Sequence, residues 1–200
     1  MNFNKYSKIW DNQDHIRRAI VVAESIRPAL ALAPHHHVLE FGCGTGLVSF
    51  ALNEPVERLV MVDTSEGMLE ILKEKIAHHR IQYMIPHLGD IPEETFDVIH
   101  TTMVLHHIPD ITDTLQKLHQ RLKPGGRLAI VDLVEDDGSF HAHFTDHQVH
   151  HGFNPDTLKE KLEAQGFTGI SHQLIFSGKR HHGERESEYE LFMIVGEKEQ

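Results

Sequence analysis

The segment from residue 38 to residue 50, VLEFGCGTGLVSF, constrains the fold of this chain more than any other. An apolar run ends in Glu40, three glycines follow at alternate positions, and the next apolar stretch has the spacing of a helix. Glycine reaches turn conformations that a Cβ atom forbids, so the segment predicts a strand that turns sharply into a helix. Such a turn lets a ligand lie against the main chain near the positive end of that helix. The pattern is typical of sites that hold nucleotide-like molecules.

The spacing of the glycines separates several classes of nucleotide-binding turn. The dinucleotide fingerprint G-x-G-x-x-G needs a third glycine where Leu47 stands. The phosphate loop of NTPases needs a G-K-[ST] ending, and no lysine lies near Gly46. The segment from Glu40 to Gly46 fits better the E-x-G-x-G-x-G pattern of S-adenosylmethionine (SAM) enzymes. Because glycines also mark ordinary strand–turn–helix corners, the assignment depends on the rest of the chain.

Strand-like and helix-like segments alternate from the glycine turn to residue 134. The expected strands are 38–41, 58–63, 81–87, 96–101 and 127–134, and the expected helices are 14–32, 45–53, 65–79 and 110–122. This alternation predicts a parallel sheet with helices on both faces. In the tail, a helix over 155–165 precedes strands over 168–177 and 188–195, whose polar link predicts an antiparallel hairpin at the sheet edge.

Polar residues stand at or just past the predicted ends of the strands: Glu40, Asp63, Asp90, Thr101 and Asp132. Ligands of parallel α/β sheets bind beyond these carboxyl ends. An acid at Asp63 can accept hydrogen bonds from both hydroxyls of a ribose, as in NAD enzymes. An acid at Asp90 suits an exocyclic amine such as adenine N6. Asp132 is open to two interpretations, a ligand contact or a solvated strand end.

Four segments follow the glycine turn in a fixed order: VDTSEGML (62–69), LGDI (88–91), FDVIHTTMVLHHIPD (96–110) and LKPGGRLAIVDL (122–133). Together they resemble the class I SAM-dependent methyltransferases, in the small-molecule, type 11-like branch, over roughly residues 32–134. The resemblance implies an α/β fold, a Rossmann-like three-layer sandwich whose seven-stranded, mostly parallel sheet has the order 3-2-1-4-5-7-6 with strand 7 antiparallel. It also implies one domain over 1–200, with a helical lid (1–33), a SAM-binding core (34–134) and an acceptor-site loop, helix and hairpin (135–200).

The resemblance further implies which residues bind SAM. Those bordering its methionine portion are Glu40, Gly42, Gly44 and Thr45. Those holding its ribose and adenine are Asp63, Thr64, Met68, Asp90 and Ile91. Two others follow the fourth strand, Thr101 near the amino-acid group and His106 near the methyl group. The N-terminal KYSKIWD looks like the lid, with Tyr6 or Trp10 as its covering aromatic residue.

The function expected from the resemblance is transfer of a methyl group from SAM to a small-molecule acceptor by in-line displacement. A general base is needed only where the acceptor has a proton to lose, and the candidates are His106, His143 and His147. A nicotinamide-dependent oxidoreductase stays an alternative, although Leu47 and the lack of a Tyr-x-x-x-Lys pair count against it. A non-catalytic SAM-binding module and a metal-handling protein on the same fold are further alternatives.

Histidines are unusually frequent in this chain, 19 in all, and five fall in the stretch FHAHFTDHQVHHGF (140–153). We expect this stretch to be a histidine-rich surface or a wall of the acceptor site, without a metal. The alternative is a metal site: were the stretch helical, His143, His147 and His151 or His150 would share a face at ligand spacing.

The net charge and the composition of the chain limit the classes of molecule that it can be expected to bind. A net charge of −11 argues against a nucleic-acid substrate and favours a neutral or cationic small molecule. No apolar run is long enough to span a bilayer and the N-terminus has no signal-peptide core, so we expect no membrane partner. The single cysteine, Cys43, fits a reducing cytoplasm and is expected to fill the turn rather than act as a nucleophile. The oligomeric state and the acceptor atom stay open.

Overall fold

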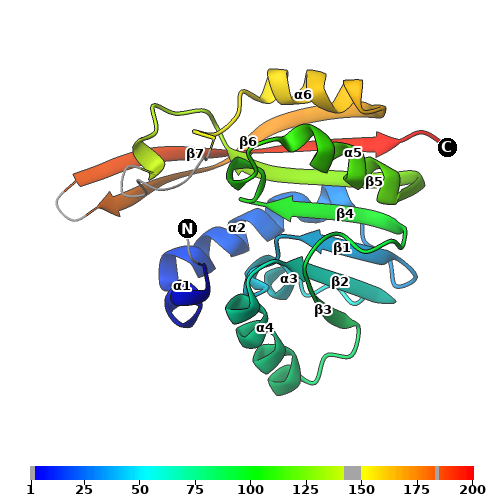
Figure 1. Ribbon diagram of the computed structural model, residues 1–200, viewed down its shortest axis with the longest axis horizontal. Coiled ribbons are helices and arrows are strands. Elements are labelled where there is room, and N and C mark those ends of the chain that lie inside the picture. Colours follow the sequence, from blue (N-terminus) through cyan, green and yellow to red (C-terminus); the bar gives the residue numbers. More distant parts are fainter. Residues whose placement is uncertain (1–2, 142–149, 183–184) are drawn as a thin grey trace.

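The computed structural model describes residues 3–141, 150–182 and 185–200, and within them a seven-stranded sheet forms the centre of the molecule (Figure 1). Its order is β3-β2-β1-β4-β5-β7-β6. The strands are β1 (His37–Phe41), β2 (Arg58–Asp63), β3 (Met84–Leu88), β4 (Phe96–Thr102), β5 (Leu122–Leu133), β6 (Phe167–His182) and β7 (Arg185–Lys198). β1 to β5 pair in parallel, whereas β7 is antiparallel to both β5 and β6. The predicted order and the antiparallel seventh strand are confirmed.

Helices cover both faces of the sheet, which confirms the three-layer sandwich (Figure 1). The α-helices are α1 (Phe3–Trp10), α2 (Gln13–Leu30), α3 (Leu47–Leu52), α4 (Glu66–His79), α5 (Ile111–Arg121) and α6 (Pro155–Ala164). Successive strand residues point to opposite faces. Val38 therefore packs in one apolar cluster with α2, α3 and α4, while Leu39 packs in the other with α5 and α6. Two buried layers hold the sheet, so the ends of its strands are the surfaces left for a site.

Capping residues fix where several helices begin. The Ser65 hydroxyl accepts a hydrogen bond from Met68 N at the start of α4, and Asn154 accepts from Asp156 N and Thr157 N at the start of α6. Such caps satisfy backbone donors that the first helical turn leaves unpaired. α3 starts differently, because its N-cap is Gly46 at φ +81° and no side chain among the described residues caps it.

Two segments differ from the sequence expectation. Phe96 pairs with Leu122 and Val98 pairs with Arg127, so residues 123–126 bulge from a longer β5 instead of forming a turn before it. The expected polar link 178–187 is largely paired strand, since β6 runs to residue 182 and β7 starts at residue 185. Lys179 Nζ lies across the hairpin from two glutamates, 2.6 Å from Glu186 Oε1 and 3.8 Å from Glu188 Oε1. Backbone hydrogen bonds between the strands and cross-strand pairs of opposite charge stabilise these ends of β6 and β7. Their sequence therefore lacks the apolar alternation that marks a buried strand.

The N-terminal helices lie at the end of the sheet where the parallel strands finish, and the β6–β7 hairpin projects on that same side (Figure 1). Asn4 of α1 joins this arrangement to α4, because its side-chain oxygen accepts hydrogen bonds from Ser65 Oγ at 2.7 Å and Gly67 N at 2.9 Å. Among the described residues, no helix combines the length and the apolar character needed to cross a membrane.

Candidate functional site

The glycine turn, residues 42–46, is held against β2 by its main chain. Gly42 N and Cys43 N both donate to the carbonyl oxygen of Val62, at 2.8 and 2.9 Å. Gly42 has φ +74°, and a Cβ there would lie 2.2 Å from Val104 Cγ2. Close packing against the loop after β4 therefore requires a glycine at this position.

Gly44 has a different environment. Its φ is +54°, and a Cβ there would come no closer than 3.9 Å to the next described side chain, at Trp10 Nε1. The space beside Gly44 belongs to a cavity of about 640 Å³. This glycine is where a ligand can approach the backbone, whereas Gly42 is a packing glycine.

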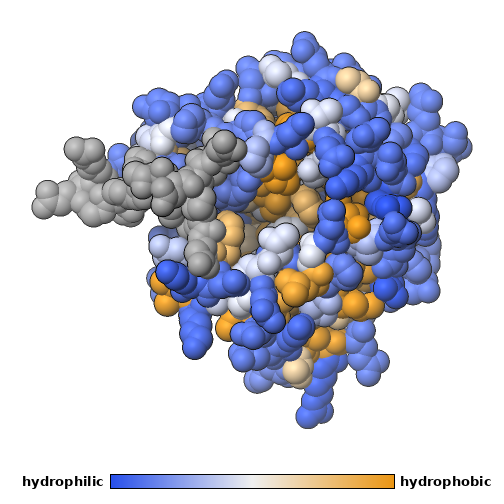
Figure 2. All heavy atoms as spheres, viewed as in Figure 1, coloured by the Kyte–Doolittle hydropathy of each residue, from blue (hydrophilic) through white to orange (hydrophobic). Residues whose placement is uncertain are grey.

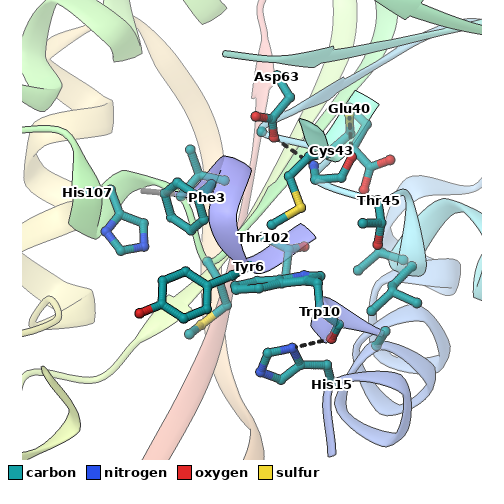
Figure 3. Close-up of a pocket in the computed structure, with 18 of the residues that line it drawn as sticks. Phe3, Tyr6, Trp10, His15, Glu40, Cys43, Thr45, Asp63, Thr102 and His107 are labelled. Carbon is teal, nitrogen blue, oxygen red and sulfur yellow. Dashed lines mark hydrogen bonds between the residues drawn. The ribbon is translucent and has the colours of Figure 1, made fainter. Parts of the chain in front are cut away.

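The cavity lies beyond the carboxyl ends of the central strands, and the face that carries it is hollowed near its middle (Figure 2). It brings together eight of the residues predicted to bind the cofactor, and both aromatic residues predicted for the lid also line it. The eight are Glu40, Gly42, Gly44, Thr45, Asp63, Thr64, Met68 and His106. Figure 3 shows Phe3, Tyr6 and Trp10 of α1 reaching into this space.

Three predicted residues lie outside the lining of the cavity. The Asp90 side chain is 70% exposed and forms an ion pair with Lys117 at 3.2 Å. Ile91 belongs to the apolar cluster that also contains α5, and Thr101 is buried next to Thr102, which does line the cavity. Gly89, directly before Asp90, lines the cavity as well, so the loop after β3 reaches it through its main chain. The roles of Asp90, Ile91 and Thr101 stay predictions.

Two carboxylates form the acidic end of the cavity. Glu40 is almost fully buried, and its Oε2 accepts a hydrogen bond from Ser49 Oγ at 2.5 Å. Burial, with a further contribution from the neighbouring Asp63 charge, raises the pKa of Glu40 to about 8. Asp63 accepts from Gly44 N at 2.7 Å and from Ser65 N at 2.8 Å, yet burial still raises its pKa above the ordinary value. Glu40 is therefore mostly protonated near pH 7 in the ligand-free protein, and a ligand that brings donors or positive charge favours its ionised form.

Cys43 lies beside these carboxylates and is buried. Burial raises the pKa of its thiol well above the ordinary value, and the Glu40 and Asp63 charges raise it further. A thiol that stays protonated is a poor nucleophile. This agrees with the expectation that Cys43 fills the turn.

A network of charged groups ties the N-terminal helices to the glycine turn. Asp11 accepts a hydrogen bond from Thr45 Oγ1 at 2.5 Å and forms an ion pair with Lys75 at 2.6 Å. Lys75 Nζ also donates to the carbonyl oxygen of Thr45 at 2.8 Å. Thr45, which the sequence predicts beside the cofactor, thus contacts the segment between α1 and α2 as well. The helix that covers the cavity is attached at the point where a ligand would lie.

The opposite end of the cavity, here called the histidine end, is lined by His106, His107, Phe140, His141 and Arg180. His106 is fully buried, and its Nδ1 lies 2.5 Å from Asp132 Oδ1. Asp132 is itself fully buried and also accepts from Leu133 N at 2.8 Å. The structure excludes the solvated strand end for Asp132, and it does not place Asp132 in the lining of the cavity either, so Asp132 reaches the cavity only through His106.

The other imidazoles of the histidine end are poorly solvated. Burial lowers the pKa of His107 to about 2, and the neighbouring His106 and His141 rings add to this. Burial, followed by His106 and Arg180, lowers the pKa of His141 to about 4. Both rings are therefore neutral at physiological pH.

Sequence reasoning missed His107 and Arg180, and it named His141 only within the histidine-rich stretch. The adjacent pair His106-His107 in LHHI was the available signal, but nothing local places a hairpin residue such as Arg180 beside it. His143 and His147 lie outside the described residues. His151 is exposed, next to Gly138.

The sheet order, the reversed β7 and the cavity at the glycine turn define the fold of a class I SAM-dependent methyltransferase. A family model described as a methyltransferase domain matches residues 14–172. The chain belongs to this family of SAM-dependent methyltransferases.

Individual relatives agree with this assignment. An uncharacterised methyltransferase of Schizosaccharomyces pombe is 32% identical over 140 residues, covering 60% of this chain and 49% of the relative. A demethylmenaquinone methyltransferase of Symbiobacterium thermophilum is 32% identical over 116 residues, covering 54% of this chain and 46% of the relative. The chain thus matches about half the length of each. A chain from the complex of the Haloferax volcanii Trm112 activator with a methyltransferase shares the fold, with TM-score 0.79 at 15% identity over 100% of this chain and 96% of that one.

Proposed function

We propose that this protein transfers a methyl group from SAM to a small-molecule acceptor. The observation that carries the proposal is one cavity with two different ends, the acidic end with Glu40, Gly44 and Asp63 and the histidine end around His106. The demethylmenaquinone methyltransferase among the relatives acts on a small molecule, which supports the acceptor class.

The acidic end fits the chemical groups of SAM. The buried Glu40 and the half-buried Asp63 supply carboxylate acceptors for the donors of a ribose and of an amino-acid group, and Gly44 leaves room where a side chain would intrude. The buried Met68 and the exposed Thr64 both line the same space, which suits the face of a purine. Glu40 and Asp63 would therefore hold the cofactor, and the cationic sulfonium offsets the cost of their burial.

When bound, SAM would supply a methyl group on a positively charged sulfur, whose carbon an acceptor could attack in line with the C–S bond, with neutral S-adenosylhomocysteine as the leaving group. The chain contributes orientation and the exclusion of water, which together lower the barrier of a well-aligned transfer by up to about 7–11 kcal/mol. Phe3, Tyr6 and Trp10 provide an apolar cover over the cavity, so α1 acts as the lid (Figure 3).

An acceptor oxygen or nitrogen that carries a proton has to lose it. Asp132 accepts from His106 Nδ1, which fixes the proton on that nitrogen and leaves Nε2 as the basic one. His106 is the general base that we propose for the metal-free protein, with Asp132 as its positioning residue. A positioned base contributes about 10²- to 10⁴-fold to such a step.

The test combines binding with turnover. Calorimetry with SAM and with NADH comes first, and binding of NADH without SAM would replace this proposal by the oxidoreductase alternative. A metabolite library is then screened for S-adenosylhomocysteine release. Release with at least one acceptor is expected, and His106→Gln should lower kcat while SAM affinity holds. A protein that binds SAM but releases no product with any acceptor would be a SAM-binding module.

A further inference from the structure

Three imidazoles converge at the histidine end of the cavity. His106 and His107 belong to the 3₁₀ turn after β4 (Leu105–His107), and His141 to the 3₁₀ turn after β5 (Ser139–His141). One ring nitrogen from each lies within 4.8 Å of the other two. The ring centroids are 4.0 Å apart for His106 and His107, 5.1 Å for His106 and His141, and 5.7 Å for His107 and His141.

We propose that His106, His107 and His141 form a binding site for a divalent transition metal, with Zn²⁺ as the best fit. Imidazole nitrogen is a preferred ligand of Zn²⁺, and three histidines with an open fourth position form a known catalytic zinc set. Zn–N bonds of about 2.0–2.1 Å place tetrahedral ligand nitrogens about 3.4 Å apart. Metal binding would therefore require rotation of the His107 and His141 side chains, because the three nitrogens now lie within 4.8 Å of one another.

The surroundings of His106 support a metal more than a solvated surface cluster. His106 is 1% exposed and Asp132 is 0% exposed, and the carboxylate holds Nδ1 at 2.5 Å. A carboxylate behind a histidine fixes the ring and makes the other nitrogen a stronger ligand. His141 is buried and His107 half-buried, and all three histidines line the cavity, so within the described part of the chain the site opens into the cavity.

The charge around the site indicates what completes it. The Arg180 guanidinium lies 4.3 Å above the Phe140 ring and bears electrostatically on both His107 and His141. A dication beside this arginine favours an anionic fourth ligand, such as hydroxide or an acceptor phenolate, enolate or carboxylate oxygen. Use of an acceptor oxygen depends on the proposed function, whereas metal binding by the three histidines does not. With metal bound, His106 Nε2 would be a ligand and no longer a base, so the metal would lower the pKa of the acceptor hydroxyl and its proton would pass to solvent.

The experiment titrates Co²⁺ into protein made without a histidine tag and stripped with a chelator. One equivalent of Co²⁺ is expected to give the intense visible absorption of tetrahedral cobalt. One equivalent of Zn²⁺ should then displace the Co²⁺ and remove this absorption. His107→Asn and His141→Asn should abolish the tetrahedral spectrum, and Asp132→Asn should weaken affinity by about 10- to 100-fold. The matched control replaces the exposed pair His78-His79, whose rings lie 5.1 Å apart, with asparagine and should leave the spectrum unchanged.

Two results would overturn the metal site. One is a weak octahedral cobalt spectrum at every ratio, and the other is an equal loss of binding in the His78-His79 control. Calorimetry with SAM on the stripped protein separates this outcome from the proposed function. Unchanged SAM binding with no cobalt site removes the metal alone, whereas a cobalt site without SAM binding removes the methyltransferase proposal and keeps the metal.

Discussion

Gly42 and Gly44 both have positive φ, but different neighbours make them different kinds of site residue. A side chain at Gly42 would collide with Val104, whereas one at Gly44 would enter the cavity. A single motif in the sequence therefore contains one position that is closely packed and another that borders open space in the cavity. Residue-level tests can separate the two.

We expect Gly42→Ala to affect stability and Gly44→Ala to affect binding. Alanine in the left-handed region costs roughly 1–2 kcal/mol at either position. Gly42→Ala adds the collision at 2.2 Å with Val104, which raises the loss by a further ~1–3 kcal/mol. Urea unfolding should show the larger loss of unfolding free energy for Gly42→Ala. SAM calorimetry should show that Gly44→Ala loses more SAM affinity than its smaller loss of stability explains. Equal stability losses would contradict the distinction between the two glycines.

Glu40 gives a prediction about pH. Its folded pKa of about 8 lies above the ordinary value of 4.5, so folding takes up a proton between these two values. The contribution of Glu40 to the stability of the ligand-free protein therefore falls as pH rises through that window and stays low above it. Glu40→Gln removes this dependence. The difference between the urea midpoint of the variant and that of the wild type should therefore shift in favour of the variant as pH rises from about 5 to about 9. Ser49→Ala leaves the carboxylate in place but removes a hydrogen bond that lowers its pKa, so the dependence on pH should persist and extend to higher pH.

At the level of elements, α1 is attached to the core at two ends. Asn4 binds the start of α4, and Asp11 binds Thr45 and Lys75 beside the glycine turn. The contacts are polar and partly exposed, which gives the helix a lower local stability than the sheet. A cover held in this way can open to admit a ligand without loss of the fold.

Asp11→Asn should loosen α1 without unfolding the protein. The variant loses the ion pair with Lys75, a partly exposed contact of at most about 1 kcal/mol. Amide hydrogen exchange of residues 3–10 should accelerate and SAM affinity should fall, while the urea midpoint moves little. Asp14, an exposed acid in the first turn of α2, provides the matched control. Asp14→Asn should change neither the exchange of residues 3–10 nor the SAM affinity. Unaltered exchange in Asp11→Asn would show that Asn4 and the aromatic contacts suffice.

For the whole molecule, the cavity joins segments from both ends of the chain. Its lining runs from Phe3 to Arg180, so a ligand that filled it would contact the N-terminal helices, the carboxyl ends of the central strands and the hairpin together. A ligand that binds the folded state and not the unfolded state raises the free energy of unfolding of the whole protein. SAM is therefore expected to stabilise the protein as a unit.

We expect SAM at 100 times its Kd to add about 2.7 kcal/mol to the free energy of unfolding, seen as a higher Tm. Asp63→Ala removes a carboxylate at the acidic end and should lose most of this increase. Asp113→Ala, at the exposed first turn of α5, is the control and should retain it. A Tm that rises equally in both variants would remove Asp63 from the cofactor site.

The sequence alone determined the order and type of the core elements and, through the family resemblance, the sheet order. Strand and helix periodicities, caps and turn glycines are local, so they can be recognised from neighbouring residues. Only the tertiary structure decided which side chains share the cavity: it buried Asp132 against His106, left Asp90 at the surface and brought His141 and Arg180 to the same end. Those contacts depend on strand register and on how separate loops pack, and no local pattern encodes either.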